Sequence, residues 1–153
     1  MHLYLIRHAH ALDGDDDDSR PLSRKGRKQA RTLARFLREA GAFEAEEIWH
    51  SPLRRARETS ALLAKHLQTK VRLTAVAGLR PEDPGDSILG KLRKTRRTVA
   101  LVGHEPHLSA LATLLVTGEA APPRFMFKKC AALRLDRVAG GWAVRWQVSP
   151  ELI

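Results

Sequence analysis

Short apolar runs that stop at polar residues recur along this chain. The first, Leu3 to Ile6, ends at Arg7-His8. Runs of this length, bounded by polar or turn-forming residues, predict buried β-strands. Three later segments are also predicted to be strands, and the third is the strongest: Ile48-Trp49, Val71 to Val76 and Thr98 to Val102. Near the end of the chain, two further apolar segments flank Ala139-Gly140-Gly141 and predict a hairpin; they are Ala131 to Leu135 and Trp142 to Val148.

Between these strands the apolar positions recur with the period of a helix. Ser23 is a suitable N-cap for a helix that runs to about Ala40, where Gly41 ends it. One face of this helix is apolar and another is basic, with Ala30, Leu33, Ala34 and Leu37 on the first and Arg24, Lys28, Arg31, Arg35 and Arg38 on the second. We interpret the basic face as solvated.

Three more helices are predicted farther along the chain. One covers about Leu53 to Leu67, with Ala56, Leu63 and Leu67 facing inward. A short one ends near Lys94, with Asp86 or Ser87 as its cap. The last begins at Pro106 and carries an apolar stripe of Leu108, Leu111, Ala112 and Leu115.

Strands that alternate with helices predict a three-layer α/β/α sandwich, in which helices cover both faces of a mostly parallel sheet. The terminal hairpin adds antiparallel pairing at one edge. Two segments are predicted to be loops: the acidic stretch Asp13 to Asp18, and Gly78 to Gly85, which is rich in proline and glycine. A chain of 153 residues fits one domain, residues 1–153.

The composition narrows the class of partner. A net charge of +10 favours an anionic or phosphorylated partner. Nucleic acid is disfavoured, because aromatic residues make up only 5% and no nucleic-acid motif is present. No apolar stretch approaches the ~20 residues of a membrane span, so we expect no membrane partner. With no leader pattern at the N-terminus, the expected location is cytoplasmic. The lone Cys130 precedes an apolar strand and reads as inert core.

Notable residues follow three of the predicted strands. The first strand ends in Arg7-His8, the second in Ser51-Pro52-Leu53-Arg54-Arg55, and the strongest in Gly103-His104. In open α/β sheets, sites form beyond the carboxyl ends of the strands. Arginine grips phosphate oxygens, and histidine can attack phosphorus or donate a hydrogen bond. Histidines and arginines converging at one edge would therefore suit phosphoryl transfer, which depends mainly on positioning and charge neutralisation.

These segments resemble the motifs of the histidine phosphatase superfamily, whose fold is phosphoglycerate mutase-like. Leu5-Ile6-Arg7-His8-Ala9-His10 resembles its Arg-His-Gly motif, and Gly103-His104 matches its second histidine. The stretch from Ser51 to Thr59 resembles its Ser-x-x-x-Arg-Ala-x-x-Thr motif, an alignment that selects Arg55 rather than Arg54. A further stretch, Arg20-Pro21-Leu22-Ser23 with Gly26 and Gln29-Ala30, matches in order and spacing. Within the superfamily the chain looks most like the SixA-type phosphohistidine phosphatases.

The resemblance implies a role for each matched residue. His8 would be the covalent nucleophile of a phosphohydrolase, with Arg7, Arg55 and His104 as catalytic and substrate-binding residues. Arg20 would be a weaker substrate contact. The phosphorylated substrate would be a phosphohistidine-bearing protein, and no cofactor or metal would be required.

Two departures from the family pattern bear on the chemistry. The glycine and the acidic residue that usually follow the histidine are Ala9 and His10 here. The glutamate that protonates the leaving oxygen in many members has no clear equivalent, although Glu82 and Asp83 lie in the right interval. An alkoxide needs such an acid, whereas imidazole departs more readily. The missing acid therefore favours a phosphohistidine substrate.

Other interpretations remain open from the residues alone. His2, His8 and His10 share one side of an extended strand and could suggest a metal site, although Arg7 would repel a cation there. The run Asp15 to Asp18 could hold a cation but lacks the ligand alternation of a calcium loop, so a solvated loop is expected. The alternatives in function are a small-molecule phosphomonoesterase and a non-catalytic module that binds phosphate or nucleic acid.

Overall fold

The computed structural model describes residues 1–153 and contains one six-stranded sheet, with strand order β3-β2-β4-β1-β5-β6. The first four strands in this order are parallel, and β5 and β6 pair antiparallel at one edge. The strands are β1 His2–Arg7, β2 Glu47–His50, β3 Arg72–Ala75, β4 Val99–Gly103, β5 Ala132–Val138 and β6 Gly141–Val148. The mostly parallel sheet with a terminal hairpin is as the sequence predicts.

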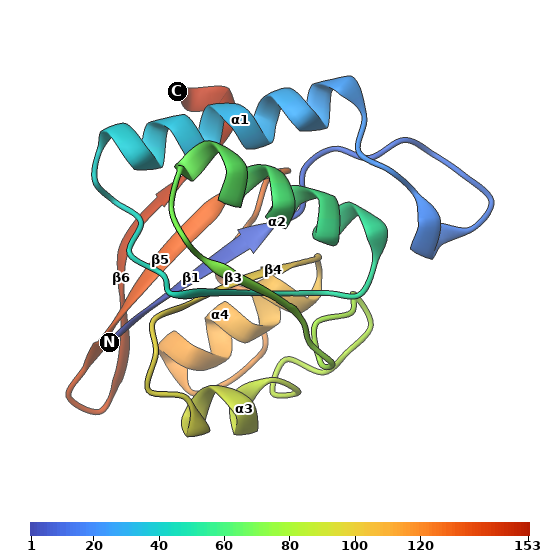
Figure 1. The fold of residues 1–153 in the computed structure, drawn as a ribbon. Coiled ribbons are helices and arrows are strands. Elements are labelled where there is room, and N and C mark those ends of the chain that lie inside the picture. Colours follow the sequence, from blue (N-terminus) through green and yellow to red (C-terminus); the bar gives the residue numbers. More distant parts are fainter.

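Four α-helices cover the two faces of the sheet. They are α1 Arg24–Glu39, α2 Arg54–Leu67, α3 Leu89–Lys94 and α4 His107–Thr117, and two 3-10 turns cover Asp17–Ser19 and Pro150–Leu152. Figure 1 shows α1 and α2 on one side of the sheet and α3 and α4 on the other. The predicted three-layer α/β/α sandwich is therefore confirmed.

Strand β1 shows why both faces are covered. Tyr4 and Ile6 belong to the core under α1 and α2, whereas Leu3 and Leu5 belong to the core under α3 and α4. Side chains alternate across a strand, so a run of four apolar residues supplies both cores at once. All four are fully buried.

The helix boundaries follow the predicted signals with one exception. Ser23 caps α1 by accepting a hydrogen bond from the Gly26 N–H at 3.0 Å. The predicted cap of α3 by Asp86 or Ser87 is wrong. The N-cap residue is Ile88, and no side chain makes a capping hydrogen bond at this end of the helix. The Ser87 hydroxyl is engaged elsewhere, since it donates to the Gly78 carbonyl at 2.6 Å.

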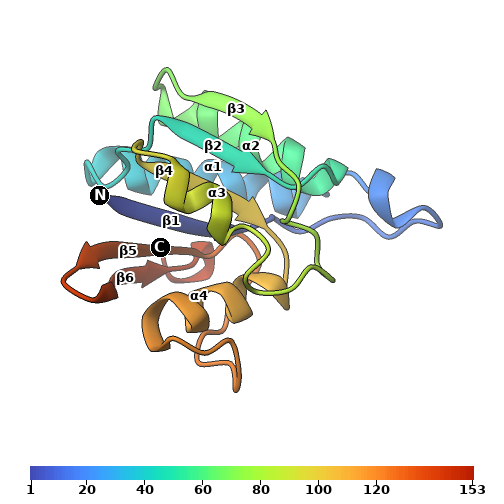
Figure 2. The same cartoon turned by 90° about the horizontal axis from the view of Figure 1, so that it is seen from below.

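The register of the sheet brings the ends of three strands together. Arg7, at the end of β1, is level with Gly103 at the end of β4, and His50 of β2 is level with Val102. The residues that follow these strands therefore share one edge. The loop between β1 and α1 extends outward from this edge (Figure 2). No helix has the length and apolar character needed to cross a membrane.

Candidate active site

Two histidines face each other where β1 and β4 end. The ring centroids of His8 and His104 are 5.0 Å apart, with the ring planes inclined by 50°. A hydrogen bond from the His8 backbone N–H to the Gly103 carbonyl, at 2.9 Å, extends the β1–β4 pairing by one residue and fixes this approach. Both residues are buried, His8 being 4% and His104 1% exposed. The structure thus unites two residues separated by most of the chain.

The His8 ring has one nitrogen engaged and one available. Its Nδ1 atom lies 2.7 Å from the Ala9 carbonyl oxygen. A carbonyl can only accept, so Nδ1 must carry the proton in this hydrogen bond. In the neutral ring, Nε2 then keeps its lone pair. Nε2 is thereby the nitrogen that can attack an electrophile.

Burial keeps both imidazoles uncharged. It is the largest cause that lowers the pKa of His8 to about 2, and the nearby charges of Lys129 and Arg55 act in the same direction. The pKa of His104 is lowered to about 3, again mainly by burial and then by Arg55. Removal from water disfavours the charged form of an imidazole. At neutral pH the free protein therefore presents two neutral rings.

Arg55 is the arginine of its motif that reaches the site. Its side chain is 5% exposed, and it donates through Nη1 to the Asp17 carbonyl at 2.7 Å. The neighbouring Arg54 is 44% exposed and pairs along its own helix with Glu58, at 2.8 Å. The structure therefore agrees with the motif alignment, which selects Arg55 rather than Arg54.

Thr59 links the second motif to the His8 loop. Its hydroxyl accepts a hydrogen bond from the Ala9 N–H at 3.0 Å and donates to the Arg55 carbonyl at 2.7 Å. One side chain thus ties the segment after His8 to the turn of α2 that carries Arg55. The motif spacing indicates Thr59, but only the structure shows what its hydroxyl holds.

The stretch at the start of α1 holds the backbone of His10. The His10 N–H donates to the Gln29 side chain at 2.9 Å, and its ring Nδ1 lies 2.7 Å from the Ser23 hydroxyl. Gly26 passes so close that a Cβ there would overlap the His10 carbonyl. These contacts explain the Ser-x-x-Gly-x-x-Gln spacing, because Ser23, Gly26 and Gln29 all meet the backbone of His10. They also turn the His10 ring toward α1.

Arg7 and the other site residues carry polar atoms without a partner. Arg7 donates through Nη1 to the Phe127 carbonyl at 2.7 Å, but its Nε is buried and unpaired. Arg55 Nε and both ring nitrogens of His104 are also buried and unpaired. Buried polar atoms normally have a hydrogen-bond partner, so such a cluster indicates a place for a polar ligand. Its donors suit an anion.

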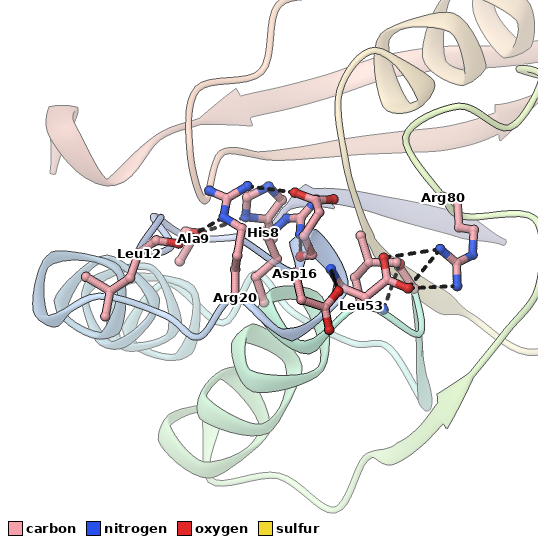
Figure 3. A network of polar contacts seen from close by, with 11 residues as sticks. His8, Ala9, Leu12, Asp16, Arg20, Leu53 and Arg80 are labelled. Atoms are coloured by element: carbon pink, nitrogen blue, oxygen red, sulfur yellow. Dashed lines mark hydrogen bonds and ion pairs between the residues drawn. The ribbon is translucent and has the colours of Figure 1, made fainter. Parts of the chain in front are cut away.

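Arg20 reaches the site through the acidic loop. It donates through Nε to the Leu12 carbonyl at 2.8 Å and through Nη1 to the Asp17 carboxylate at 3.0 Å. Figure 3 shows this network, with Arg80 at its far end. Arg80 meets Asp18 at 3.4 Å. The loop is exposed, as predicted, but Asp17 also contacts two arginines, which the interpretation as a solvated loop did not foresee.

The two acidic residues considered as proton donors lie in other surroundings. Asp83 accepts a hydrogen bond from the Arg80 backbone N–H at 2.8 Å, and its charge acts on His107 rather than on His8 or His104. Glu82 is exposed and makes no hydrogen bond or ion pair. Neither carboxylate is part of the histidine pair's environment.

The suggestion of a metal site at the N-terminus is not supported by the arrangement. His2 pairs with Glu44 at 3.0 Å, at the opposite end of β1 from His8. No group of three or more histidine, cysteine, aspartate or glutamate side chains is arranged to hold a metal ion.

The fold and site define an α/β protein with a buried histidine pair and unpaired arginine nitrogens at one edge of its sheet. The chain belongs to the histidine phosphatase superfamily (branch 1), whose sequence model matches residues 3–86. It is accordingly a phosphatase, a hydrolase that acts on a phosphorylated substrate.

Individual proteins resemble the chain over most of its length. It is 28% identical to the phosphohistidine phosphatase SixA of Escherichia coli, over 98% of this chain and 94% of that protein. It is 32% identical to an uncharacterized protein of Picosynechococcus, over 78% of this chain and 75% of that protein. The solved structure of the protein histidine phosphatase SixA complexed with tungstate matches with a TM-score of 0.86 and 26% identity, over 99% of both chains.

Proposed function

We propose that this phosphatase hydrolyses phosphohistidine in a protein, with His8 as the covalent nucleophile. The observation that carries the proposal is the composition of the pocket. It combines a neutral nucleophile and unpaired cationic donors, and neither Glu82 nor Asp83 belongs to the surroundings of the histidine pair. The similarity to SixA over nearly the whole chain supports the same substrate class.

The reaction proceeds in two displacements at phosphorus. His8 Nε2 attacks the phosphoryl group of the substrate, a P–N bond to His8 forms, and the substrate's own P–N bond breaks. The substrate imidazole leaves with the electron pair and takes up a proton. A water molecule then attacks phospho-His8, which releases inorganic phosphate and restores the lone pair on Nε2.

Arg7, Arg55 and His104 would hold the transferred phosphoryl group, with Arg20 as a weaker contact. Their unpaired nitrogens supply donors for equatorial oxygens. His104 is neutral in the free protein, and a phosphoryl dianion would raise its pKa and favour the protonated donor. The tungstate bound in the similar SixA structure is a tetrahedral oxyanion, which supports this use of the pocket.

The basicity of the leaving group determines which substrate suits this site, a phosphohistidine or an alkyl phosphate. Asp17 is the carboxylate whose charge acts on His104, and its hydrogen bond from Arg20, aided by Arg55, lowers its pKa. It is therefore ionised at neutral pH and has no proton to give. Imidazole accepts a proton near neutrality and needs little help, whereas an alkoxide needs an acid in the transition state.

The test is kcat/KM for the wild type on a phosphohistidine protein, an aryl phosphate and an alkyl phosphate. We expect the rate to fall in that order. Glu82→Gln and Asp83→Asn should change it little on the phosphohistidine protein. A preference for the alkyl phosphate would contradict the proposal and favour a small-molecule phosphomonoesterase. A large loss in either variant on every substrate would reveal a general acid and also overturn it. Failure to turn over any substrate would indicate a non-catalytic binding module.

A further inference from the structure

A tight turn before β5 carries a basic residue, Lys129, and its backbone is bonded to the His8 residue. The Ala131 N–H donates to the Lys128 carbonyl at 2.9 Å, which makes Lys129 and Cys130 the central residues of the turn. Cys130 adopts a positive φ of 61° and is fully buried in the core under α1 and α2. A residue in this conformation with a buried side chain anchors the turn. Lys129 is therefore presented from a fixed position.

The same turn is bonded to both residues of the first motif. The Cys130 N–H donates to the His8 carbonyl at 3.1 Å, and the Arg7 N–H donates to the Ala131 carbonyl at 3.0 Å. The Arg7 guanidinium donates to Phe127, just before the turn, at 2.7 Å. These bonds link the backbone on both sides of Lys129 to the nucleophile and to a phosphate-binding candidate.

Lys129 is partly buried and has neither an ion pair nor a side-chain hydrogen bond. Burial is the largest cause that lowers its pKa to about 8, and the charges of Arg7, Arg20 and Arg55 act in the same direction. Among the neighbouring charges, Lys129 has the largest effect on the pKa of His8, and it also lowers that of His104. Its neighbour Lys128, by contrast, is exposed. The charge of Lys129 thus acts on both histidines of the site.

Cations from three other segments of the chain act on Lys129: Arg7 at the end of β1, Arg20 after the acidic loop and Arg55 on α2. Two carboxylates act on these arginines, Asp17 on Arg20 and Arg55 and Glu105 on Arg7. Asp17 bonds to Arg20 and Arg55 but not to Lys129. Like charges held together cost free energy unless an anion offsets them. The excess positive charge matches a phosphoryl group, which carries two negative charges in its fully ionised form.

We propose that Lys129 is a further catalytic residue, whose ammonium contacts an oxygen of the phosphoryl group during transfer to His8. The proposal rests on the proposed function of the pocket. Lys129 acts through its charge and transfers no proton, so the bonds that form and break are those already given. It would increase the affinity of the pocket for the transition state, in which negative charge is spread over the equatorial oxygens.

Tungstate binding tests the contact without requiring a substrate. Binding to wild type, Lys129→Met, Lys129→Arg and the control Lys128→Met is measured by calorimetry, with circular dichroism to verify folding. We expect Lys129→Met to weaken tungstate binding by about tenfold or more and to lower kcat/KM for an aryl phosphate by about 10²-fold. Lys128→Met should stay within about twofold, since an exposed charge is screened.

The pH dependence separates a charge contact from a structural role. Wild-type tungstate affinity should fall as pH rises through about 8, because Lys129 loses its proton there. This fall should disappear in Lys129→Met and move to higher pH in Lys129→Arg, whose guanidinium stays charged. Tungstate keeps a constant charge over this range.

Unchanged tungstate affinity and an unchanged pH profile in Lys129→Met would overturn the proposal. So would equal losses in Lys128→Met and Lys129→Met. Failure of the proposed function is distinguishable, because a wild type that binds tungstate but turns over no phosphate ester or phosphohistidine would leave the Lys129 contact measurable.

Discussion

The carboxylate of Asp17 lies 3.2 Å from Nη2 of Arg55, and its own backbone carbonyl accepts from Nη1 of the same guanidinium at 2.7 Å. In the free protein, one acidic residue thus occupies two donors of a buried arginine. The carboxylate bridges to Arg20 as well, at 3.0 Å. Asp17 therefore stands where its charge opposes that of an incoming phosphoryl group.

We predict that Asp17→Asn tightens tungstate binding by about two- to fivefold, the scale of one exposed ion pair. The backbone carbonyl still holds Arg55 in the variant, so the main change is the loss of a competing negative charge. Calorimetric titration measures the effect, and Asp15→Asn, in the same loop, serves as the control. Weaker binding in Asp17→Asn would mean that the carboxylate mainly orients the arginines.

Replacing His8 with Ala should abolish turnover while leaving the fold intact, because the Nε2 lone pair is the proposed nucleophile. Rapid quench of the wild type with labelled substrate should trap an acid-labile phosphoenzyme, which the variant should lack. His10→Ala is the matched control, since its ring is turned toward Ser23 of α1. Near-normal turnover in His8→Ala would disprove the covalent mechanism.

Arg55→Ala should lower kcat/KM by on the order of 10²-fold or more, as expected for the loss of one preorganised charged donor. Arg54→Ala should be far milder, because that side chain points to Glu58 and solvent. Both variants are assayed on the same aryl phosphate. A larger loss in Arg54→Ala would mean that the motif has been misaligned.

The buried histidines should make stability sensitive to mild acid. The pKa values of His8 and His104 lie below their ordinary value of 6.5 in the folded protein, so below that pH the unfolded chain binds more protons. Their contribution to stability is present above pH 6.5 and is lost as pH falls, with a slope of up to ~1.4 kcal/mol per pH unit for each proton.

Urea unfolding between about pH 4.5 and 6.5 measures this slope before most carboxylates titrate. In His104→Asn the free energy of unfolding should depend less steeply on pH than in the wild type. The slope is the readout, since the substitution can also change the absolute stability. Equal slopes in the two proteins would show that His104 is not held neutral by burial.

Activity should survive dialysis against EDTA, because the cationic pocket already supplies the charge that a metal would provide. The assay compares treated and untreated enzyme on one aryl phosphate, before and after a divalent ion is added back. Loss of turnover that the ion restores would contradict both metal independence and the proposed mechanism.

Much of this architecture can be predicted from local pattern. The apolar runs and caps of the sequence indicate the strands and most helix ends, because burial and capping act over a few residues. The cap of α3 could not be predicted in this way. Ser87 has the right residue type, but a tertiary contact with Gly78 takes its hydroxyl away from the helix.

The residues of the site also fall into two groups, those that the motif spacing indicates and those that it does not. Motif spacing brings together Arg7, His8, Arg55 and His104, and the structure places them at one edge of the sheet. Asp17 and Lys129 carry no such signal. In the sequence they are one of four consecutive aspartates and one of two consecutive lysines, each typical of solvated surface. Only the folded loop and the turn bonded to His8 distinguish them from their neighbours.

The unpaired donors around His8 and His104 also couple occupancy of the pocket to the thermal stability of the protein. A ligand that binds the folded chain alone adds RT ln(1 + [L]/Kd) to the free energy of unfolding. Inorganic phosphate, the reaction product, should therefore raise the melting temperature as its concentration increases. A thermal-shift series of oxyanions would then rank them by affinity before any substrate is known, and would calibrate product inhibition from the same titration.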